Sequence, residues 1–287
     1  MITKRYNITK TKSRRSTKHD IPLKSPIPHS NSIWIIRHLH RMDRDEPDHW
    51  RRNPRMLQNF LDTPLTNFGK DAAAKAGLEI VQNTPDIDLI EFIYSSPFTR
   101  CIETSIEIAK IINKKKRHTK KPCKIRIEYG LSETIPVQLD FIKVLDKELT
   151  IDKFPLLDYE MSIDRIYTRY SSFIDISYKS LYKKSDIIAE TLTNSADRIV
   201  KVMQYFEKNK FENFVICSHQ IPVTLTSMYL YEKNFPPAYM YKINPPIKDN
   251  KTDMNPKRLT SYGILSGFVK INNKWKYIYP PNNDYFQ

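Results

Sequence analysis

Short apolar runs recur along this chain and predict buried β-strands. Each is bounded by polar residues, which is typical of a strand that is covered on both faces. The runs lie at residues 33–36, 92–94 and 214–217, and Ile125-Arg126-Ile127 is a further strand candidate. Residues 264–271 and 275–279 predict a closing hairpin, with its turn at Asn272 and Asn273.

Helical spacing of apolar residues fills the stretches between these strands. Thr66 is a suitable N-cap for a helix through about residue 82, and four-residue spacing predicts its buried side as Phe68, Ala72, Ala76 and Ile80. Ser96 and Pro97 predict the start of a second helix, because proline favours the first helical position. A long helix is predicted over about 186–209, and Pro222 predicts the opening of another.

Strands that alternate with helices predict an α/β fold. We expect a three-layer sandwich, with a mostly parallel sheet and helices on both faces. Residues 1–31 are basic, rich in Ser and Thr and end in a Pro-rich stretch, so we expect a disordered N-terminal arm. Residues 32–287 then form one domain, in which the irregular, aromatic segment at about 134–185 is a candidate lid.

Composition excludes two common phosphate sites. The chain has only 5 glycines in 287 residues and lacks both the P-loop and the G-x-G-x-x-G patterns. Its net charge is +15, from 47 basic and 32 acidic residues, and much of the excess lies in the arm and in residues 114–124. Tyr6 is the one Phe, Trp or Tyr residue within these basic runs, and no nucleic-acid motif accompanies them, so we expect solvated charge and no specific nucleic-acid partner.

Three cysteines without a C-x-x-C pair favour a reducing compartment over a disulfide framework or a zinc site. No apolar stretch is long enough to span a membrane. The expected location is the cytoplasm, with the nucleus as an alternative and the mitochondrion less favoured. A homodimer is left open.

Charged and nucleophilic side chains follow each of the four predicted strands. The carboxyl ends of parallel strands form one crevice, where ligands of such sheets bind. After the first strand come Arg37, His38 and Arg41. Arg100 follows the second strand, Glu133 the third and His219 the fourth. We therefore expect these side chains to meet in one pocket.

Three guanidiniums and two imidazoles around one point favour a dianion such as phosphate. Neighbouring arginines lower the pKa of a histidine, which keeps the imidazole neutral and nucleophilic. A neutral imidazole can attack phosphorus and become a phosphohistidine, while a carboxylic acid protonates the leaving oxygen. No cofactor and no metal are needed for this chemistry.

A known family carries the same pieces in the same order. They are Arg37-His38 with Arg41 and Asp43, the segment Asp62–Thr66 with Gly69, the segment Ser95–Cys101, and Ser218-His219. Together they resemble the histidine phosphatase superfamily, also called phosphoglycerate-mutase-like. The run around Arg37 and the closing Tyr262-Gly263-Ile264 resemble the branch of the suppressor of T-cell receptor signalling phosphatases and the ecdysteroid-phosphate phosphatases.

The resemblance implies a phosphoglycerate-mutase-like fold over about 32–280 and roles for individual residues. His38 matches the nucleophile, and Arg37, Arg41 and Arg100 match the phosphate-binding arginines. His219 matches the second histidine of the pocket, with a part in both catalysis and phosphate binding. Glu133 matches the proton donor; its competitor, Glu128, is expected to lie in a structural ion pair. The segment Asp62–Thr66 is expected to shape the helix entry.

Two positions depart from the family pattern. Leu39 stands where the family usually has glycine after the nucleophile, and Gln220 stands where a small residue is usual. A side chain at position 39 is expected to crowd the phosphate or shift the backbone, so reduced activity is predicted and Leu39→Gly should raise it.

The implied function is a metal-independent phosphomonoesterase with a phosphorylated small molecule or phosphoprotein as substrate. Phosphotyrosine and aryl, steroid or sugar phosphates all remain open. Tyr159, Tyr167, Tyr170, Phe154 and Phe173 either line an aromatic cavity or pack the region. One alternative is a catalytically weak protein that only binds phosphorylated ligands. Another is a metal-dependent hydrolase built on His38, His40 and His219, which the flanking arginines disfavour.

Overall fold

A six-stranded mixed sheet forms the centre of the molecule. The computed structural model describes residues 31–53, 62–134, 167–188, 190, 192–209, 212–232 and 262–282. Within these residues the strand order is β3-β2-β4-β1-β5-β6. The first four strands in that order run parallel to one another, β5 pairs antiparallel with β1 and β6 antiparallel with β5, which confirms the mostly parallel sheet. Their bounds are β1 Ser32–Arg37, β2 Phe92–Ser95, β3 Lys124–Ile127, β4 Phe214–Ser218, β5 Leu265–Ile271 and β6 Lys274–Asn282.

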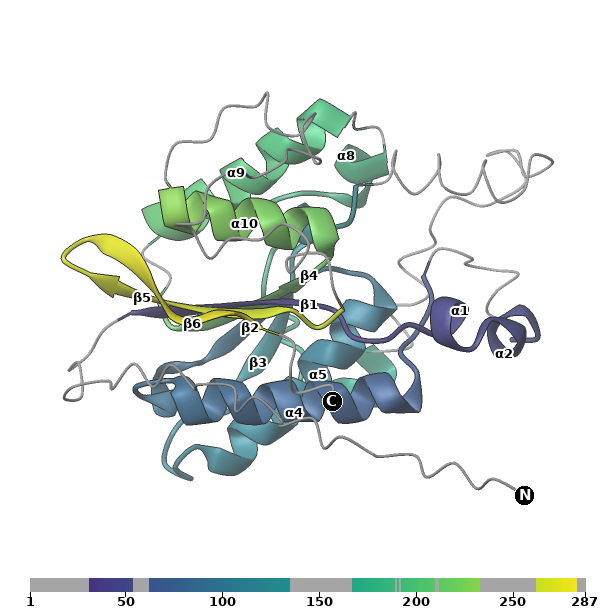
Figure 1. The fold of residues 1–287 in the computed structure, drawn as a ribbon, viewed down its shortest axis with the longest axis horizontal. Helices are drawn as coiled ribbons and strands as arrows, with labels where there is room; N and C mark the ends of the chain where they lie inside the picture. The colour runs from purple at the N-terminus through teal and green to yellow at the C-terminus, as the bar shows by residue number, and fades with distance from the viewer. Residues whose placement is uncertain are drawn as a thin grey trace, which may run out of the picture.

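Helices cover both faces of this sheet, as expected (Figure 1). On one face lie α4 (Asn67–Asn83) and α5 (Thr99–Lys115), and on the other lie α9 (Leu192–Lys208) and α10 (Gln220–Glu232). Each face has its own large apolar cluster: one contains buried residues of α4 and α5, and the other contains Val202, Met203 and Phe206 of α9. The three-layer sandwich is therefore confirmed.

The central strands bring the candidate site residues to one edge. Trp34, Ile35 and Ile36 of β1 are fully buried, as a strand covered on both faces requires. In the register of the sheet Arg37 lies opposite Ser218, so β1 and β4 end level with each other. The short helices α1 (Met42–Asp45) and α2 (Pro47–Arg51) leave the sheet at this carboxyl edge.

Helix α4 begins where the sequence predicts. The Thr66 hydroxyl accepts a hydrogen bond from the Gly69 N–H at 2.9 Å, and Ala72, Ala76 and Ile80 are buried. The prediction of a buried Phe68 is wrong, because its side chain is 50% exposed. The first turn of α4 lies beside the end of β1, where the Phe68 ring contacts His40 at 4.8 Å instead of entering the core.

Two other helix boundaries differ from the predictions. Helix α5 begins at Thr99, two residues after Pro97, with Phe98 as its N-cap. The long helix over 186–209 is in fact two helices, α8 (Lys184–Ile188) and α9. The break falls around Glu190, whose carboxylate turns back to hold Arg198 of α9 with hydrogen bonds of 2.7 Å at both oxygens.

The closing hairpin is confirmed. Asn272 and Asn273 have φ values of 50° and 59°, which are the left-handed conformations that a two-residue hairpin turn requires. Short 3₁₀ turns, η1 (Ile87–Leu89) and η2 (Tyr129–Leu131), precede β2 and follow β3.

The two remaining predictions about organisation fall mostly outside the described residues. Of the predicted arm, only Asn31 is described, and its carbonyl accepts a hydrogen bond from the Lys270 N–H. Of the predicted lid, residues 135–166 lie outside the description. Among the residues that are described, no helix is long and apolar enough to cross a membrane.

Candidate active site

His38 lies at the carboxyl end of β1 and is held there by its backbone. Its N–H donates to the Ser218 carbonyl at 2.9 Å, and its own carbonyl accepts from the Gly263 N–H at 3.2 Å. The residue is 1% exposed. Two strands and the turn before β5 therefore fix its position.

A neighbouring carbonyl sets the tautomer of the His38 ring. Nδ1 lies 2.9 Å from the Leu39 carbonyl oxygen, which can only accept, so Nδ1 carries the proton and Nε2 keeps its lone pair. Burial, followed by the charges of Arg100, Arg37 and Arg41, holds the pKa of His38 well below its usual range. The imidazole is therefore neutral at physiological pH, with Nε2 as its basic atom.

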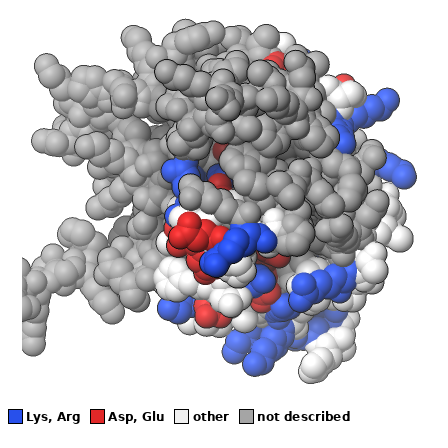
Figure 2. Space-filling model, turned by 90° about the vertical axis from the view of Figure 1, so that its right-hand side faces the viewer, with Lys and Arg blue, Asp and Glu red and all other residues white. Residues whose placement is uncertain are grey.

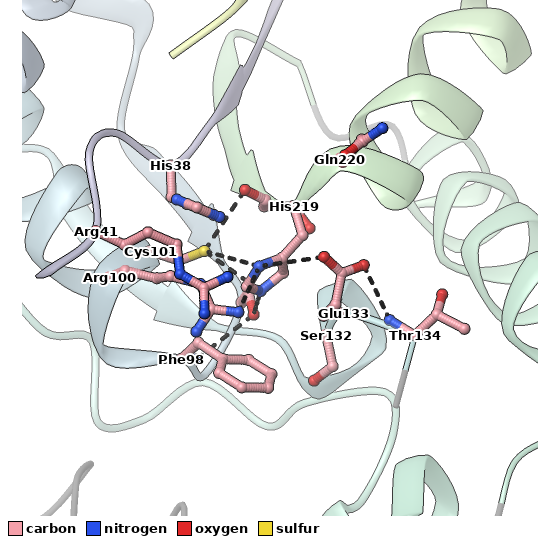
Figure 3. A network of polar contacts seen from close by, with 12 residues as sticks. His38, Arg41, Phe98, Arg100, Cys101, Ser132, Glu133, Thr134, His219 and Gln220 are labelled. Carbon is pink, nitrogen blue, oxygen red and sulfur yellow. Dashed lines mark hydrogen bonds and ion pairs between the residues drawn. The ribbon is translucent and has the colours of Figure 1, made fainter. Parts of the chain in front are cut away.

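The second histidine, His219, follows β4 and lies beside the first (Figure 3). The two ring centroids are 5.2 Å apart and the rings meet edge to face. An Arg100 amino group donates to Nδ1 of His219 at 3.1 Å, so Nε2–H donates to the Ser96 hydroxyl at 2.8 Å. Burial and the charge of Arg100 hold the pKa of His219 well below its usual range.

Three arginines converge on this pair, and each has a different support. The Arg37 guanidinium lies 4.6 Å from the centre of the Tyr262 ring. Arg100 is fully buried and stacks on Phe98 at 4.3 Å. The Arg41 guanidinium donates two hydrogen bonds to the Asp43 carboxylate, of 2.7 and 2.6 Å.

The charges of the arginines reinforce the expectation of an anion. Burial lowers the pKa of Arg37 to about 10, and burial together with the charge of Arg41 lowers that of Arg100. Burial acts the same way on Arg41, but Asp43 outweighs it and raises the pKa of Arg41. A bound dianion with tetrahedral oxygens would offset the repulsion between the three guanidinium charges and would accept hydrogen bonds from them.

Glu133 approaches His219 from the side away from His38 (Figure 3). Its Oε2 lies 3.9 Å from Nδ1 of His219, and its Oε1 accepts from the Thr134 N–H at 3.1 Å. Burial raises the pKa of Glu133 above its usual range, although the arginines, Arg100 foremost, oppose that shift. Raised carboxyl pKa values are what a proton donor near neutral pH needs.

The competing carboxylate, Glu128, has a different role from the one expected. It forms no ion pair among the described residues and instead accepts four hydrogen bonds. The donors are the N–H groups of Gly130 and Leu181 and the hydroxyls of Tyr178 and Ser180. Glu128 is fully buried and joins the turn after β3 to residues 178–181.

Leu39 faces the apolar core. It is 0% exposed and belongs to the cluster that contains Trp34, Ile36 and Ile102. It is also absent from the described residues with positive φ, so the backbone at this position does not need glycine. The expectation that the side chain crowds the phosphate therefore loses its structural basis.

Three residues that were not assigned to the pocket contribute to it, and a fourth, Asp62, supports the start of the next helix. Ser96 hydrogen-bonds His219, Asp43 orients Arg41, and Tyr262 lies 5.6 Å from the His38 ring. Asp62, expected to shape the entry of α4, instead accepts from the Thr99 N–H and hydroxyl at 2.5 and 2.6 Å, at the start of α5. The R-H-x-x-R-x-D spacing was the available signal for Asp43. Nothing in the sequence joins Asp62 to Thr99.

The histidine set of the alternative metal site does not assemble. His40 turns away to Asp45, 3.0 Å from its Nδ1, and contacts the rings of Phe68 and Tyr262. Across the described part of the chain, no group of three or more His, Cys, Asp or Glu side chains could hold a metal ion.

The aromatic residues of the predicted lid are only partly described. Tyr167, Tyr170 and Phe173 pack, half-buried, against the core cluster, which agrees with the packing alternative. Phe154 and Tyr159 lie outside the described residues.

The end of the molecule that carries α1 and α2 has a mixed surface (Figure 2). Acidic and basic side chains lie next to each other near the middle of this face, and basic side chains gather in its lower part.

Comparisons with known proteins agree with this geometry. Residues 33–134 match the family described as "Histidine phosphatase superfamily (branch 1)", which confirms the resemblance. The ecdysone phosphate phosphatase from Bombix mori, solved with tungstate, is 18% identical over 88% of this chain and 94% of its own, with a TM-score of 0.53. A phosphoserine phosphatase from Entamoeba histolytica is 14% identical over 89% and 99%, with a TM-score of 0.44. The first likeness supports the fold. No curated protein matches the sequence.

Proposed function

We propose that this chain, which matches the histidine phosphatase superfamily over residues 33–134, is a phosphomonoesterase that works through a phosphohistidine on His38. One observation carries the proposal: a buried, neutral imidazole whose Nδ1–H is held by the Leu39 carbonyl lies among three guanidiniums. That arrangement supplies a nucleophile and an anion site at the same point.

In the first step, Nε2 of His38 attacks phosphorus and the bond from phosphorus to the leaving oxygen breaks. Glu133, whose pKa burial raises, gives its proton in its protonated form to that oxygen, and an alcohol leaves. Arg37, Arg41 and Arg100 hold the charge on the phosphoryl oxygens during the transfer.

In the second step, water attacks the phosphohistidine. The Glu133 carboxylate takes a proton from the water as the new P–O bond forms, and the P–N bond breaks. Phosphate leaves, and His38 returns to its neutral Nδ1–H form with Glu133 protonated again. Atoms, protons and charge balance over the cycle, and no other reactant enters it.

The alternative of a protein that binds phosphorylated ligands without turnover rested on Leu39. Because the Leu39 side chain packs in the core, the structure supports turnover over binding alone. The substrate class is a phosphorylated small molecule or phosphoprotein; phosphotyrosine and aryl, steroid and sugar phosphates form the panel to assay.

The test is release of phosphate from phenyl phosphate with a chelator present, combined with trapping of a phosphorylated protein. We expect a label on His38 that is labile to acid and stable to base, in an amount that approaches one per chain. His38→Ala should abolish both label and turnover, whereas the matched control His118→Ala, an exposed histidine far from the site, should keep both. Full turnover by His38→Ala would refute the mechanism, and stoichiometric binding of phosphate esters without any label would favour the binding protein.

A further inference from the structure

The residues on both sides of Glu133 are attached to one helix, α9. Among the described residues, Glu133 itself has a contact of 3.9 Å to His219 and a hydrogen bond from its own neighbour, Thr134. Its position therefore depends on what holds the backbone of residues 130–134.

Arg198 of α9 hydrogen-bonds the backbone just before Glu133. One amino group, NH1, donates to the Gly130 carbonyl at 2.5 Å and to the Ser132 carbonyl at 3.1 Å. These carbonyls belong to the end of η2, where the turn leaves acceptors without partners of its own. Arg198 is 3% exposed, so its donors act in a buried setting.

The carboxylate of Glu190 fixes the direction of the Arg198 guanidinium. Nε and NH2 donate to its two oxygens, at 2.7 Å each, and both side chains are buried. This fork-to-fork pairing leaves NH1 as the amino group that reaches the two carbonyls. A lysine lacks the planar fork and cannot make both sets of contacts.

The residue after Glu133, Thr134, contacts the same helix one turn before Arg198. The Thr134 hydroxyl donates to the Ser195 hydroxyl at 3.3 Å, and both residues are buried. Helix α9 also packs directly against this turn: Val202 lies so close to Gly130 that an added Cβ there would collide with Cγ2 of Val202. Helix α9 therefore contacts residues 130, 132 and 134 and leaves Glu133 between two fixed points.

We infer that Arg198 is a positioning residue that places the Glu133 carboxyl for proton transfer, with Glu190 as its orienting partner. The inference rests on the proposed function and adds to it the device that holds the proton donor. A proton donor that is displaced by about 1 Å loses on the order of 10²-fold in rate. The loss falls on substrates whose leaving oxygen needs a proton.

The experiment compares two substrates. Phenyl phosphate has a poor leaving group, phenolate, whereas a nitrophenyl phosphate has a good one, nitrophenolate. Arg198→Met and the milder Arg198→Lys should lower kcat for the poor leaving group about 10²-fold and for the good one less than about fivefold. Arg117→Met, which breaks an arginine pair with Asp88 at the far end of α5, is the matched control and should lower neither. Thermal unfolding of each variant shows that the comparison is made on folded protein.

A merely structural role is separated by a double-mutant cycle. In a Glu133→Gln background, Arg198→Lys should cause no further selective loss, because the group that it positions is gone. Equal slowing of both substrates by the Arg198 variants, or an unchanged selective loss in the Glu133→Gln background, would overturn the inference. These outcomes are independent of the His38 label, which tests the proposed function itself.

Discussion

Nδ1 of His38 lies 2.9 Å from the carbonyl oxygen of Leu39, so the backbone of residue 39 fixes the proton on the ring of residue 38. The side chain of Leu39 points elsewhere, into the core cluster. The departure from glycine at this position therefore affects packing, while the contact with the nucleophile is made by an atom that every residue has.

Leu39→Gly should destabilise the protein without raising its activity. Truncation of a buried leucine to alanine costs about 2–5 kcal/mol, and glycine adds backbone freedom to the unfolded chain. Urea unfolding measures the loss, and phosphate release from phenyl phosphate measures activity. The volume-conserving Leu39→Met should cost less than about 1.5 kcal/mol. A glycine variant that is both stable and faster would show that the side chain does crowd the site.

The pH profile of kcat/KM should be bell-shaped and lie on the acid side. Attack needs neutral His38, whose pKa is well below 6.5, so the acidic limb falls well below pH 6.5. Proton donation needs protonated Glu133, so activity declines as pH rises through its raised pKa. Arg37 lowers both pKa values, so Arg37→Gln should move both limbs to higher pH. Arg117→Gln should move neither, and limbs that shift in opposite directions would contradict this account.

Stability should decline on acidification because the two buried histidines resist protonation. Their pKa values are depressed in the folded state, so below about pH 6.5 the unfolded chain binds protons that the folded chain does not. The contribution of each histidine to the free energy of unfolding is therefore fully present above that pH. It is lost as the pH falls, by up to about 1.4 kcal/mol per pH unit. The raised pKa of Glu133 acts in the opposite direction, so single variants are needed to separate the terms. Urea unfolding between pH 5 and 8 should give a shallower slope for His38→Asn than for the unmodified chain; an equal slope would contradict the prediction.

Gly69→Ala should weaken both folding and catalysis. A Cβ at position 69 would lie 2.5 Å from the backbone oxygen of His40, which cannot move without shifting the end of β1 that carries His38. Overpacking of this kind costs about 1–3 kcal/mol. Gly77→Ala is the matched control on the same helix, because its Cβ would meet Ile111 at 3.0 Å, far from the site. Unfolding curves and phenyl phosphate turnover should separate the two: Gly77→Ala should retain activity, and normal activity of Gly69→Ala would show that the strand end tolerates the shift.

The sequence predicted the sheet, its layers and the edge at which the site residues meet. Apolar runs mark strands buried on both faces, and charged residues directly after such runs identify the functional edge. This is why the order of residues along the chain was enough to place His38, His219 and Arg100 together. Thr66 was likewise predictable, because an N-cap acts on the next few residues.

What could not be predicted depends on contacts between distant segments. The break in the helix near Glu190 comes from its pairing with Arg198, and local spacing favours one continuous helix there. The direction of the Leu39 side chain depends on how β1 sits against α4 and α5. The role of Glu128 depends on Tyr178 and Ser180, some fifty residues further along the chain. No residue near β3 predicts these contacts.

The pairing of β1 with β4 and β5 has a consequence for the order in which the molecule can assemble. Ile33 lies opposite Phe214 on one side and Phe268 on the other, so the strand that precedes His38 gains its neighbours only after some two hundred further residues have been made. Pairings between such distant segments slow folding. During synthesis the first strand therefore stays without either neighbour until β4 is made, and His38 has all of its backbone partners only when residues 262–271 have followed.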